Sequence, residues 1–244
     1  MHKEKRMVVL QPFIDDGLVA DELQVVKSGK EATVYCCRTG GPGGGELLAV
    51  KVYRPLAQRR FKNDAVYQSG RVITDARMRR AFRKKSRMGR GVQFASWVGH
   101  EYETLRILHA LGADVPRPVA QSGDAILMEY VGDFDTPAPT LRQTSVPRED
   151  APRLFQQILR NVELFLAGNR VHADLSGFNI LYWRGAIRII DFPQAVDPRE
   201  NPRAFELLIR DVGNVCDCFR RHGVAADPLD IAQRMWRRYV RGEL

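Results

Sequence analysis

The sequence lacks the features that define membrane proteins and metal-thiolate proteins. Its 244 residues contain no run of the roughly 18 to 20 uncharged apolar residues that a membrane-spanning helix requires. The charged N-terminus is followed by no apolar signal region, so we expect a cytoplasmic protein without membrane contact. The four cysteines form two pairs, Cys36 with Cys37 and Cys216 with Cys218, and neither has the C-x-x-C spacing of zinc or redox sites. We therefore expect buried, reduced thiols.

Acidic residues are scarce in one part of the chain. From Arg54 to Arg90, thirteen arginines and lysines face two aspartates, a local charge of +11 in a chain whose net charge is +9. Such a segment is a candidate for contact with RNA, a ribosomal particle or another acidic partner. A solvated insertion explains the same composition equally well.

The glycine-rich segment 39–46 lacks the G-K-[ST] ending of a phosphate-binding P-loop. It also leads into a predicted strand, whereas a P-loop leads into a helix. We therefore interpret this segment as a hairpin turn.

Hydrophobic patterning predicts a first half rich in strands and a helical second half. Apolar residues at helical spacing from Phe13 to Leu23 predict a short helix before the first strand. Strands are predicted at 23–26, 32–37, 47–53, 119–120 and 125–131, with a helix at 94–111 that Gly112 ends. Further helices are predicted at 153–166, 204–221 and 228–241.

This order of elements predicts an α+β fold with a β-rich N-lobe and an α-rich C-lobe. With 44% hydrophobic residues the chain can bury a substantial core, and we expect a single domain spanning 1–244. The N-lobe would cover about 1–131, with a basic insertion at 54–93, and the C-lobe about 132–244.

The strongest chemical signal is an aspartate, an asparagine five positions later, and a second aspartate after a β-branched apolar run. These residues are Asp174, Asn179 and Asp191. Their spacing is that of a kinase catalytic loop and its magnesium aspartate. A carboxylate near the attacking oxygen can orient it and accept its proton, while an amide and a second carboxylate supply oxygen ligands suited to magnesium.

A lysine supports this interpretation. Lys51 stands alone in an apolar predicted strand, where burial of its charge without a partner would be costly. Glu101, on the predicted helix that follows, is an available partner. Pairing the two side chains would hold the ammonium group toward the phosphates of ATP.

Four segments together resemble the RIO kinases: 28–35, 128–131, 171–183 and 190–198. The discriminating part is Asp191-Phe192-Pro193-Gln194-Ala195, because ordinary protein kinases have glycine where Pro193 stands. Segments 61–64 and 67–70 resemble the flexible loop of the type-1 branch. We expect no winged-helix domain of the type-2 branch before Leu23, and the short chain is typical of a prokaryotic member.

The resemblance implies a two-lobed protein-kinase-like fold that uses ATP with Mg²⁺ or Mn²⁺. Ser28 and Lys30, in the turn after the first strand, would cover the triphosphate. The adenine would contact the backbone carbonyl of Glu129 and the backbone amide of Val131, with Met128 behind it.

The resemblance also implies roles for the chemical residues. Lys51, held by Glu101, and Asp174 would be catalytic, with Asp174 as the base. Asn179 and Asp191 would be the metal ligands, and Asp191 is a candidate acceptor of the phosphoryl group.

Three further positions bear on the resemblance. Asp211 would brace the catalytic loop by accepting its backbone amides. Ala173 replaces a glycine usual in the family, which we expect to be tolerated if its φ is negative. About twenty residues separate Asp191 from Asp211, too few for a full activation segment, so autophosphorylation or ATP hydrolysis is at least as well supported as phosphorylation of another protein.

Two other functions fit the same residues. A small-molecule phosphotransferase of the aminoglycoside type would share the two aspartates and the asparagine, and would need an acidic pocket for a cationic substrate. An ATP-regulated RNA- or ribosome-binding module would use the basic segment 54–90, with ATP state as its output.

Overall fold

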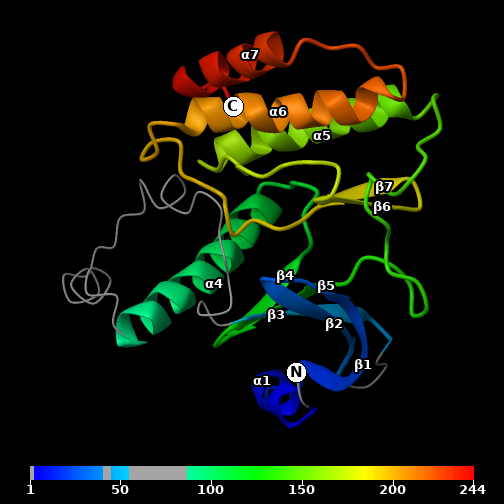
Figure 1. The fold of residues 1–244 in the computed structure, drawn as a ribbon, viewed down its shortest axis with the longest axis vertical. Helices are drawn as coiled ribbons and strands as arrows, with labels where there is room; N and C mark the ends of the chain where they lie inside the picture. Colours follow the sequence, from blue (N-terminus) through cyan, green and yellow to red (C-terminus); the bar gives the residue numbers. More distant parts are fainter. Residues whose placement is uncertain (1–2, 41–44, 55–86) are drawn as a thin grey trace. The chain divides into compact units, whose positions relative to one another are not determined.

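The computed structural model describes residues 3–40, 45–54 and 87–244 of the chain (Figure 1). Residues 41–44 of the predicted turn and 55–86 of the predicted insertion lie outside the described residues, as do segments 61–64 and 67–70. The chain forms two compact units. Of the described residues, the first unit contains 3–40, 45–54, 87–103 and 116–137, and the second contains 104–115 and 138–244.

The first unit is built on a five-stranded antiparallel sheet with the strand order β1-β2-β3-β5-β4. Its strands are β1 (Val19–Ser28), β2 (Ala32–Thr39), β3 (Leu47–Tyr53), β4 (Pro118–Ser122) and β5 (Ala125–Glu129). The central strands β3 and β5 are buried along almost their whole length, which explains why their sequences read as continuous apolar runs. All five strands are confirmed, with β1 beginning earlier and β5 ending earlier than predicted.

The helix at the start of the chain is displaced from its predicted position. Helix α1 (Lys3–Asp15) ends before Gly17, whose φ of 70° turns the chain. Beyond this turn, Val19 and Leu23 belong to β1, so the prediction of a helix over these residues was wrong. Leu10 and Phe13 of α1 pack in the same core as Val19. Apolar residues of α1 and β1 contribute to the same core, and together their spacing resembled that of a single helix.

Helix α4 (Arg87–Ala110) contributes residues to both units. It ends just before Gly112, which has a φ of 76° and donates its N–H to the carbonyl of His109. The predicted end of this helix is therefore confirmed, while its start lies seven residues earlier than predicted.

Besides the C-terminal part of α4, the described residues of the second unit form three helices and a short hairpin (Figure 1). The helices are α5 (Ala151–Ala167), α6 (Ala204–Arg220) and α7 (Pro228–Val240), and they pack against one another. The hairpin is formed by β6 (Ile180–Trp183) and β7 (Ala186–Ile189). Asp227 caps α7 by accepting the amides of Leu229 and Asp230.

The four cysteines are buried and form no disulfide, as predicted. Within the described part of the chain, no helix has the length and apolar character needed to span a membrane.

Candidate active site

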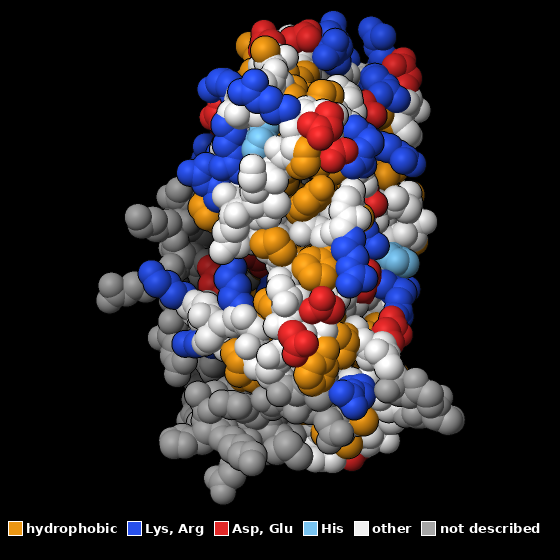
Figure 2. All heavy atoms as spheres, turned by 90° about the vertical axis from the view of Figure 1, so that its right-hand side faces the viewer, with side chains coloured by type: hydrophobic (Ala, Val, Ile, Leu, Met, Phe, Trp, Pro, Cys, Tyr) orange, Lys and Arg blue, Asp and Glu red, His pale blue; other side chains and the backbone are white. Residues whose placement is uncertain are grey.

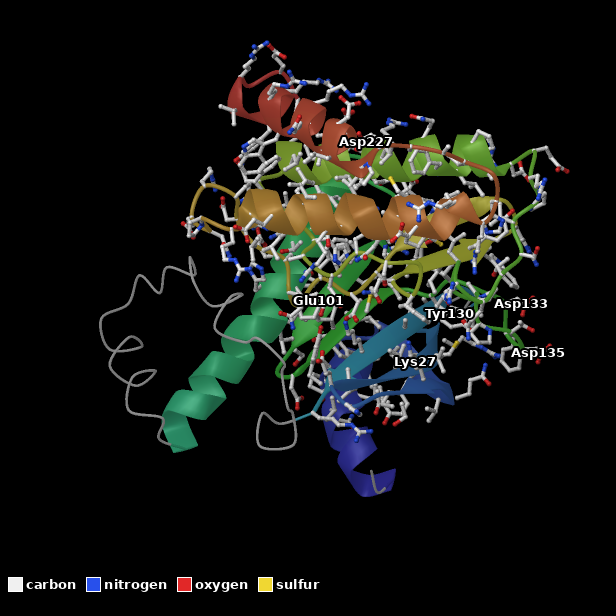
Figure 3. The ribbon with its side chains drawn as sticks, turned by 45° about the horizontal axis from the view of Figure 1, so that its top comes forward. Lys27, Glu101, Tyr130, Asp133, Asp135 and Asp227 are labelled. Atoms are coloured by element: carbon white, nitrogen blue, oxygen red, sulfur yellow. The ribbon has the colours of Figure 1, made fainter. Side chains whose placement is uncertain are left out.

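The predicted pair of Lys51 and Glu101 is confirmed in the first unit. Lys51 lies on β3, and its Nζ donates to the two carboxylate oxygens of Glu101 at 2.8 and 3.1 Å. Glu101 lies on α4 (Figure 3) and is 1% exposed, while Lys51 is 8% exposed. The Nζ also lies 5.0 Å from the ring centroid of Tyr53. Removing one partner of such a pair leaves an uncompensated buried charge, at a cost of about 3–5 kcal/mol.

The turn after β1 holds Ser28 and Lys30, both exposed. It is closed by a hydrogen bond from the N–H of Gly29 to the carbonyl of Ala32, at 2.9 Å. The Ser28 hydroxyl accepts a hydrogen bond from the guanidinium of Arg54 at 2.9 Å. From the sequence, Arg54 was predicted only as part of the basic segment, because nothing in its local sequence indicates contact with a serine 26 residues away.

The predicted adenine-contacting residues lie at the end of β5. Met128 is buried, and Glu129 exchanges hydrogen bonds with Arg117, through its backbone N–H at 2.8 Å and its carboxylate at 3.1 Å. The next residue, Tyr130, is labelled in Figure 3. Burial, and then the nearby Cys36 and Asp133, raise the pKa of Tyr130 to about 12. Val131 follows directly, so the structure keeps the three predicted residues together within four positions.

In the second unit, the loop that carries Asp174 is held by α6. Asp211 is 2% exposed and accepts the backbone N–H groups of Ala173 at 2.7 Å and Leu175 at 3.1 Å. Arg210 donates to the carbonyl of Ala173, and Asn214 donates to the carbonyl of Leu175 at 2.9 Å. The predicted bracing by Asp211 is confirmed. Burial raises the pKa of Asp211 to about 7, against the opposing effect of the two amides.

The backbone of Ala173 contradicts one expectation. We expected alanine to be tolerated there if its φ were negative, but its φ is 64°. This left-handed conformation suits glycine and costs a residue with a Cβ roughly 1–2 kcal/mol. The hydrogen bonds of Asp211 and Arg210 to Ala173 hold the strained residue in place. Asp191 has a similar φ of 74°.

His172 links the Asp174 loop to the segment that ends in Asp191. Its Nε2 lies 3.1 Å from the carbonyl of Ile190, and its Nδ1 lies 3.3 Å from the N–H of Asp174. Because a carbonyl only accepts and an N–H only donates, these contacts assign the proton to Nε2. The ring is 1% exposed and packs against Phe192 at a centroid distance of 4.6 Å. This positioning role was missed in the sequence analysis, which quoted His172 only as part of a motif.

Asp174, Asn179 and Asp191 form one polar group. The Asn179 side-chain amide donates to the carbonyl of Asp174 at 2.9 Å and approaches its carboxylate at 3.5 Å, and Ile190 donates its N–H to the carbonyl of Asn179 at 2.9 Å. Partial burial raises the pKa of Asp174, and the negative charge of Asp191 raises it further, while Arg210 and Asn179 lower it.

This group fits a divalent cation. Two carboxylates that repel each other are relieved by a shared cation, and the Asn179 amide nitrogen donates to Asp174, which leaves its oxygen as a ligand. The described residues contain no cluster of three or more His, Cys, Asp or Glu side chains arranged around a metal. The candidate metal ligands remain the two expected from the sequence, the carboxylate of Asp191 and the side-chain oxygen of Asn179.

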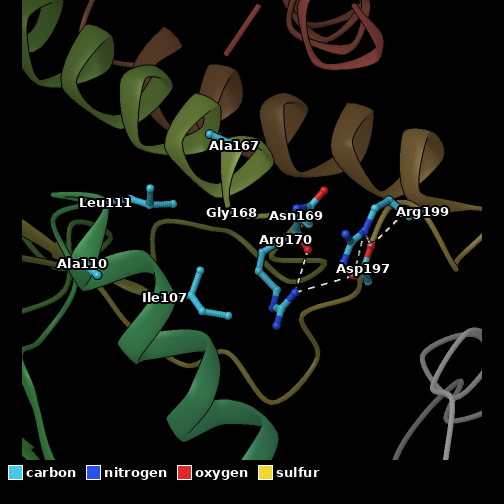
Figure 4. Close-up of a pocket in the computed structure, with 9 residues that line it drawn as sticks. All are labelled: Ile107, Ala110, Leu111, Ala167, Gly168, Asn169, Arg170, Asp197 and Arg199. Carbon is cyan, nitrogen blue, oxygen red and sulfur yellow. Dashed lines mark hydrogen bonds and ion pairs between the residues drawn. The ribbon is translucent and has the colours of Figure 1, made fainter. Parts of the chain in front are cut away.

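A separate hollow of about 550 Å³ lies in the second unit (Figure 4). Its apolar side is formed by the ends of α4 and α5, and its polar side by Asn169, Arg170, Asp197 and Arg199. Arg170 donates to the hydroxyl of Thr104 at 3.2 Å and lies 3.8 Å from Asp197, which also binds Arg199 at 2.6 Å. None of the predicted site residues lines this hollow. The ion pair between Arg170 and Asp197 joins the same two segments that meet in the isolated β-bridge between Val171 and Val196.

The antiparallel sheet with its buried Lys51–Glu101 pair, and the braced loop beside helices, define a protein-kinase-like fold. Two solved structures of the Rio2 kinase from Chaetomium thermophilum are similar to the chain, with TM-scores of 0.69 and 0.67 at 23% and 22% identity. The match covers 96% of this chain and 69% or 67% of theirs. The second of these structures is a complex with ADP, Mg²⁺ and phosphoaspartate.

The chain belongs to the RIO domain family, whose model matches residues 33–232. Human serine/threonine-protein kinase RIO1 is 31% identical over 219 residues, covering 89% of this chain. The chain spans 36% of the length of that relative. An archaeal relative, the RIO-type serine/threonine-protein kinase Rio1 of Thermoplasma acidophilum, is 31% identical over 185 residues, which cover 76% of this chain and 91% of that protein.

Proposed function

We propose that this chain is a serine/threonine phosphotransferase that depends on ATP and magnesium. The observation that carries the proposal is the buried Lys51–Glu101 ion pair. A buried pair of charges is costly to desolvate and is weak evidence for stability, so its presence in the central strand calls for a functional reason. The relatives are named serine/threonine-protein kinases, and these names support the same activity.

The first unit would bind the nucleotide. Lys51, held by Glu101, would bind the phosphates, and the turn with Ser28 and Lys30 would cover them. The backbone at Glu129 and Val131 would contact the adenine, with Met128 forming the apolar surface behind it. Because these backbone groups lie at the end of β5, the sheet itself would position the adenine.

The second unit would supply the chemistry. Asp174 would orient the attacking hydroxyl and accept its proton, since its raised pKa makes it a better base than an ordinary carboxylate. Asn179 and Asp191 would hold magnesium, which supplies charge neutralisation for the transferring phosphoryl group. Asp211 and His172 would act through the loop backbone as positioning residues.

The short segment between Asp191 and α6 supports a proposal about the acceptor. Helix α6 begins at Ala204, thirteen residues after Asp191. Because this leaves little chain to hold a peptide substrate, we propose that the phosphoryl group goes to serines or threonines of the protein itself, or to water. A related structure is named as a phosphoaspartate complex, and we propose Asp191 as the corresponding acceptor here.

The test is magnesium-dependent turnover of radiolabelled ATP by the wild type and by Asp174→Ala. We expect labelled protein and released phosphate from the wild type, and both to fall at least about 100-fold in the variant. Equal turnover by the two proteins would contradict the proposal. Hydroxylamine treatment separates labile aspartyl phosphate from stable serine or threonine phosphate, and label that resists hydroxylamine counts against Asp191 as the acceptor.

We also propose that RNA or a ribosomal particle binds through the basic segment from Arg54 to Arg90. On the face shown in Figure 2, basic and acidic side chains of the described residues are interleaved, which makes this face a poor match for a phosphate backbone. Neutralising the arginines and lysines from Arg77 to Lys85 should weaken RNA association and its salt dependence while ATP turnover continues. Unchanged association would contradict this proposal.

A further inference from the structure

We propose that Arg54 and Ser28 form one phosphate-binding unit, in which Arg54 makes the site selective for a nucleoside triphosphate. The inference rests on the proposed function, and it adds a binding residue that neither the motifs nor the resemblance indicates. It comes from the contacts that fix Arg54 to the turn after β1.

Arg54 is attached to both sides of this turn. It directly follows β3, and its backbone N–H donates to the carbonyl of Glu31 at 2.8 Å. Its guanidinium donates to the Ser28 hydroxyl at 2.9 Å. The turn is closed by the bond from Gly29 to Ala32. The guanidinium is therefore held against the turn, although the side chain of a terminal strand residue would otherwise move freely in solvent.

The bond from Arg54 prepares the Ser28 hydroxyl as a donor. A serine hydroxyl has one proton to donate and two lone pairs that accept. The guanidinium of Arg54 donates to one of these lone pairs. The second contact of the Ser28 hydroxyl, with the hydroxyl of Thr33 at 3.4 Å, is at the limit of hydrogen bonding. The Ser28 proton is thus available to an incoming anion. A phosphate oxygen can accept this proton together with a guanidinium N–H, whose planar fork matches phosphate geometry.

The charge around the turn favours a polyvalent anion. Lys51 is neutralised by Glu101. Within the described part of the chain, neither Lys30 nor Arg54 forms an ion pair with a carboxylate. Their two positive charges exceed the single negative charge of Glu31 in the same turn, and this excess attracts a triphosphate more strongly than a monophosphate.

The experiment measures the Kd of ATP, ADP and AMP in the presence of magnesium by calorimetry. We expect Arg54→Gln to weaken ATP about tenfold and AMP by less than about twofold, because only the longer phosphate chain reaches the guanidinium. Arg54→Lys keeps the charge without the fork and should lie between the wild type and Arg54→Gln. Melting temperatures equal to that of the wild type confirm that the variants are folded.

Lys27→Gln is the matched control. It removes the same charge one residue before Ser28, on β1 (Figure 3), but adjacent side chains of a strand point to opposite faces. We expect its ATP affinity to change by less than about twofold. A double-mutant cycle with Ser28→Ala should be non-additive, since each residue acts through the other.

Each outcome decides the matter. ATP affinity that is unchanged in Arg54→Gln, or weakened no more than in Lys27→Gln, overturns the inference while the proposed function stands. Equal weakening of ATP and AMP, or an additive cycle, also overturns it. If the wild type binds none of the three nucleotides, the proposed function itself fails, and this inference fails with it.

Discussion

The two units hold their functional residues by different means. In the first unit, one ion pair between side chains on a strand and a helix positions Lys51. In the second unit, side chains of α6 and His172 hold the loop of Asp174 through its backbone amides and carbonyls. The first arrangement depends on two opposite charges, and the second on several hydrogen bonds to backbone groups, which all residues except proline carry in full.

The two units are therefore sensitive to different substitutions. In the first unit, a single substitution of Lys51 removes the cation and leaves the buried Glu101 without its partner. The shape of the loop is imposed by α6, whose hydrogen bonds hold Ala173 at a φ of 64° in spite of the strain on its Cβ.

The largest effect is expected from Lys51→Met. It should lower the free energy of unfolding by about 3–5 kcal/mol, because Glu101 then remains buried without its cation. The double variant Lys51→Met with Glu101→Leu should recover most of this loss, since it removes both charges. Urea denaturation measures both values, and hydrogen exchange assigns them to the first unit. A single variant that costs less than about 1 kcal/mol would contradict the importance of the pair.

Asp211→Ala should have the next largest effect. It leaves the amides of Ala173 and Leu175 without their acceptor, at a cost of about 2–3 kcal/mol. Asp217→Ala, an exposed position on the same helix, should change stability by less than about 0.5 kcal/mol. Equal costs in the two variants would show that Asp211 does not brace the loop.

Ala173→Gly tests the strain in this loop. At ordinary φ a buried alanine replaced by glycine loses about 1 kcal/mol, as we expect for Ala232 within α7. At Ala173 the relief of a φ of 64° should offset this cost and leave the free energy of unfolding within about 0.5 kcal/mol of the wild type. Thermal denaturation of both variants makes the comparison, and equal losses would show that Ala173 is not strained.

The smallest effect concerns Asp197. Burial raises the pKa of its carboxyl, but hydrogen bonds and charge from Arg199, with the charge of Arg170, outweigh burial and lower it. A lowered pKa gives stability that is present above the unfolded pKa of about 3.9 and is lost as the pH falls through the folded value. The wild type should therefore lose up to about 1 kcal/mol more than Asp197→Asn as the pH falls below about 4. Parallel stability curves would exclude this contribution.

Much of the fold and site was predictable from local patterns. β3 was recognised with its observed bounds, because a buried central strand has a continuous apolar run. Glu101 was predicted as the partner of Lys51, since a buried lysine needs an acid and the following helix offered one. The start helix was misplaced, because Gly17 interrupts a pattern whose apolar residues continue across the turn.

Local spacing in the sequence predicted most of the strands and helices, and it indicated the residues for which we propose phosphotransfer chemistry. These properties follow from the spacing of residues close together in the chain. Only the tertiary structure decided that Arg54 meets Ser28, that Asp211 accepts amides 36 and 38 residues away, and that Ala173 adopts a positive φ. These contacts depend on how distant segments pack, which no local spacing encodes.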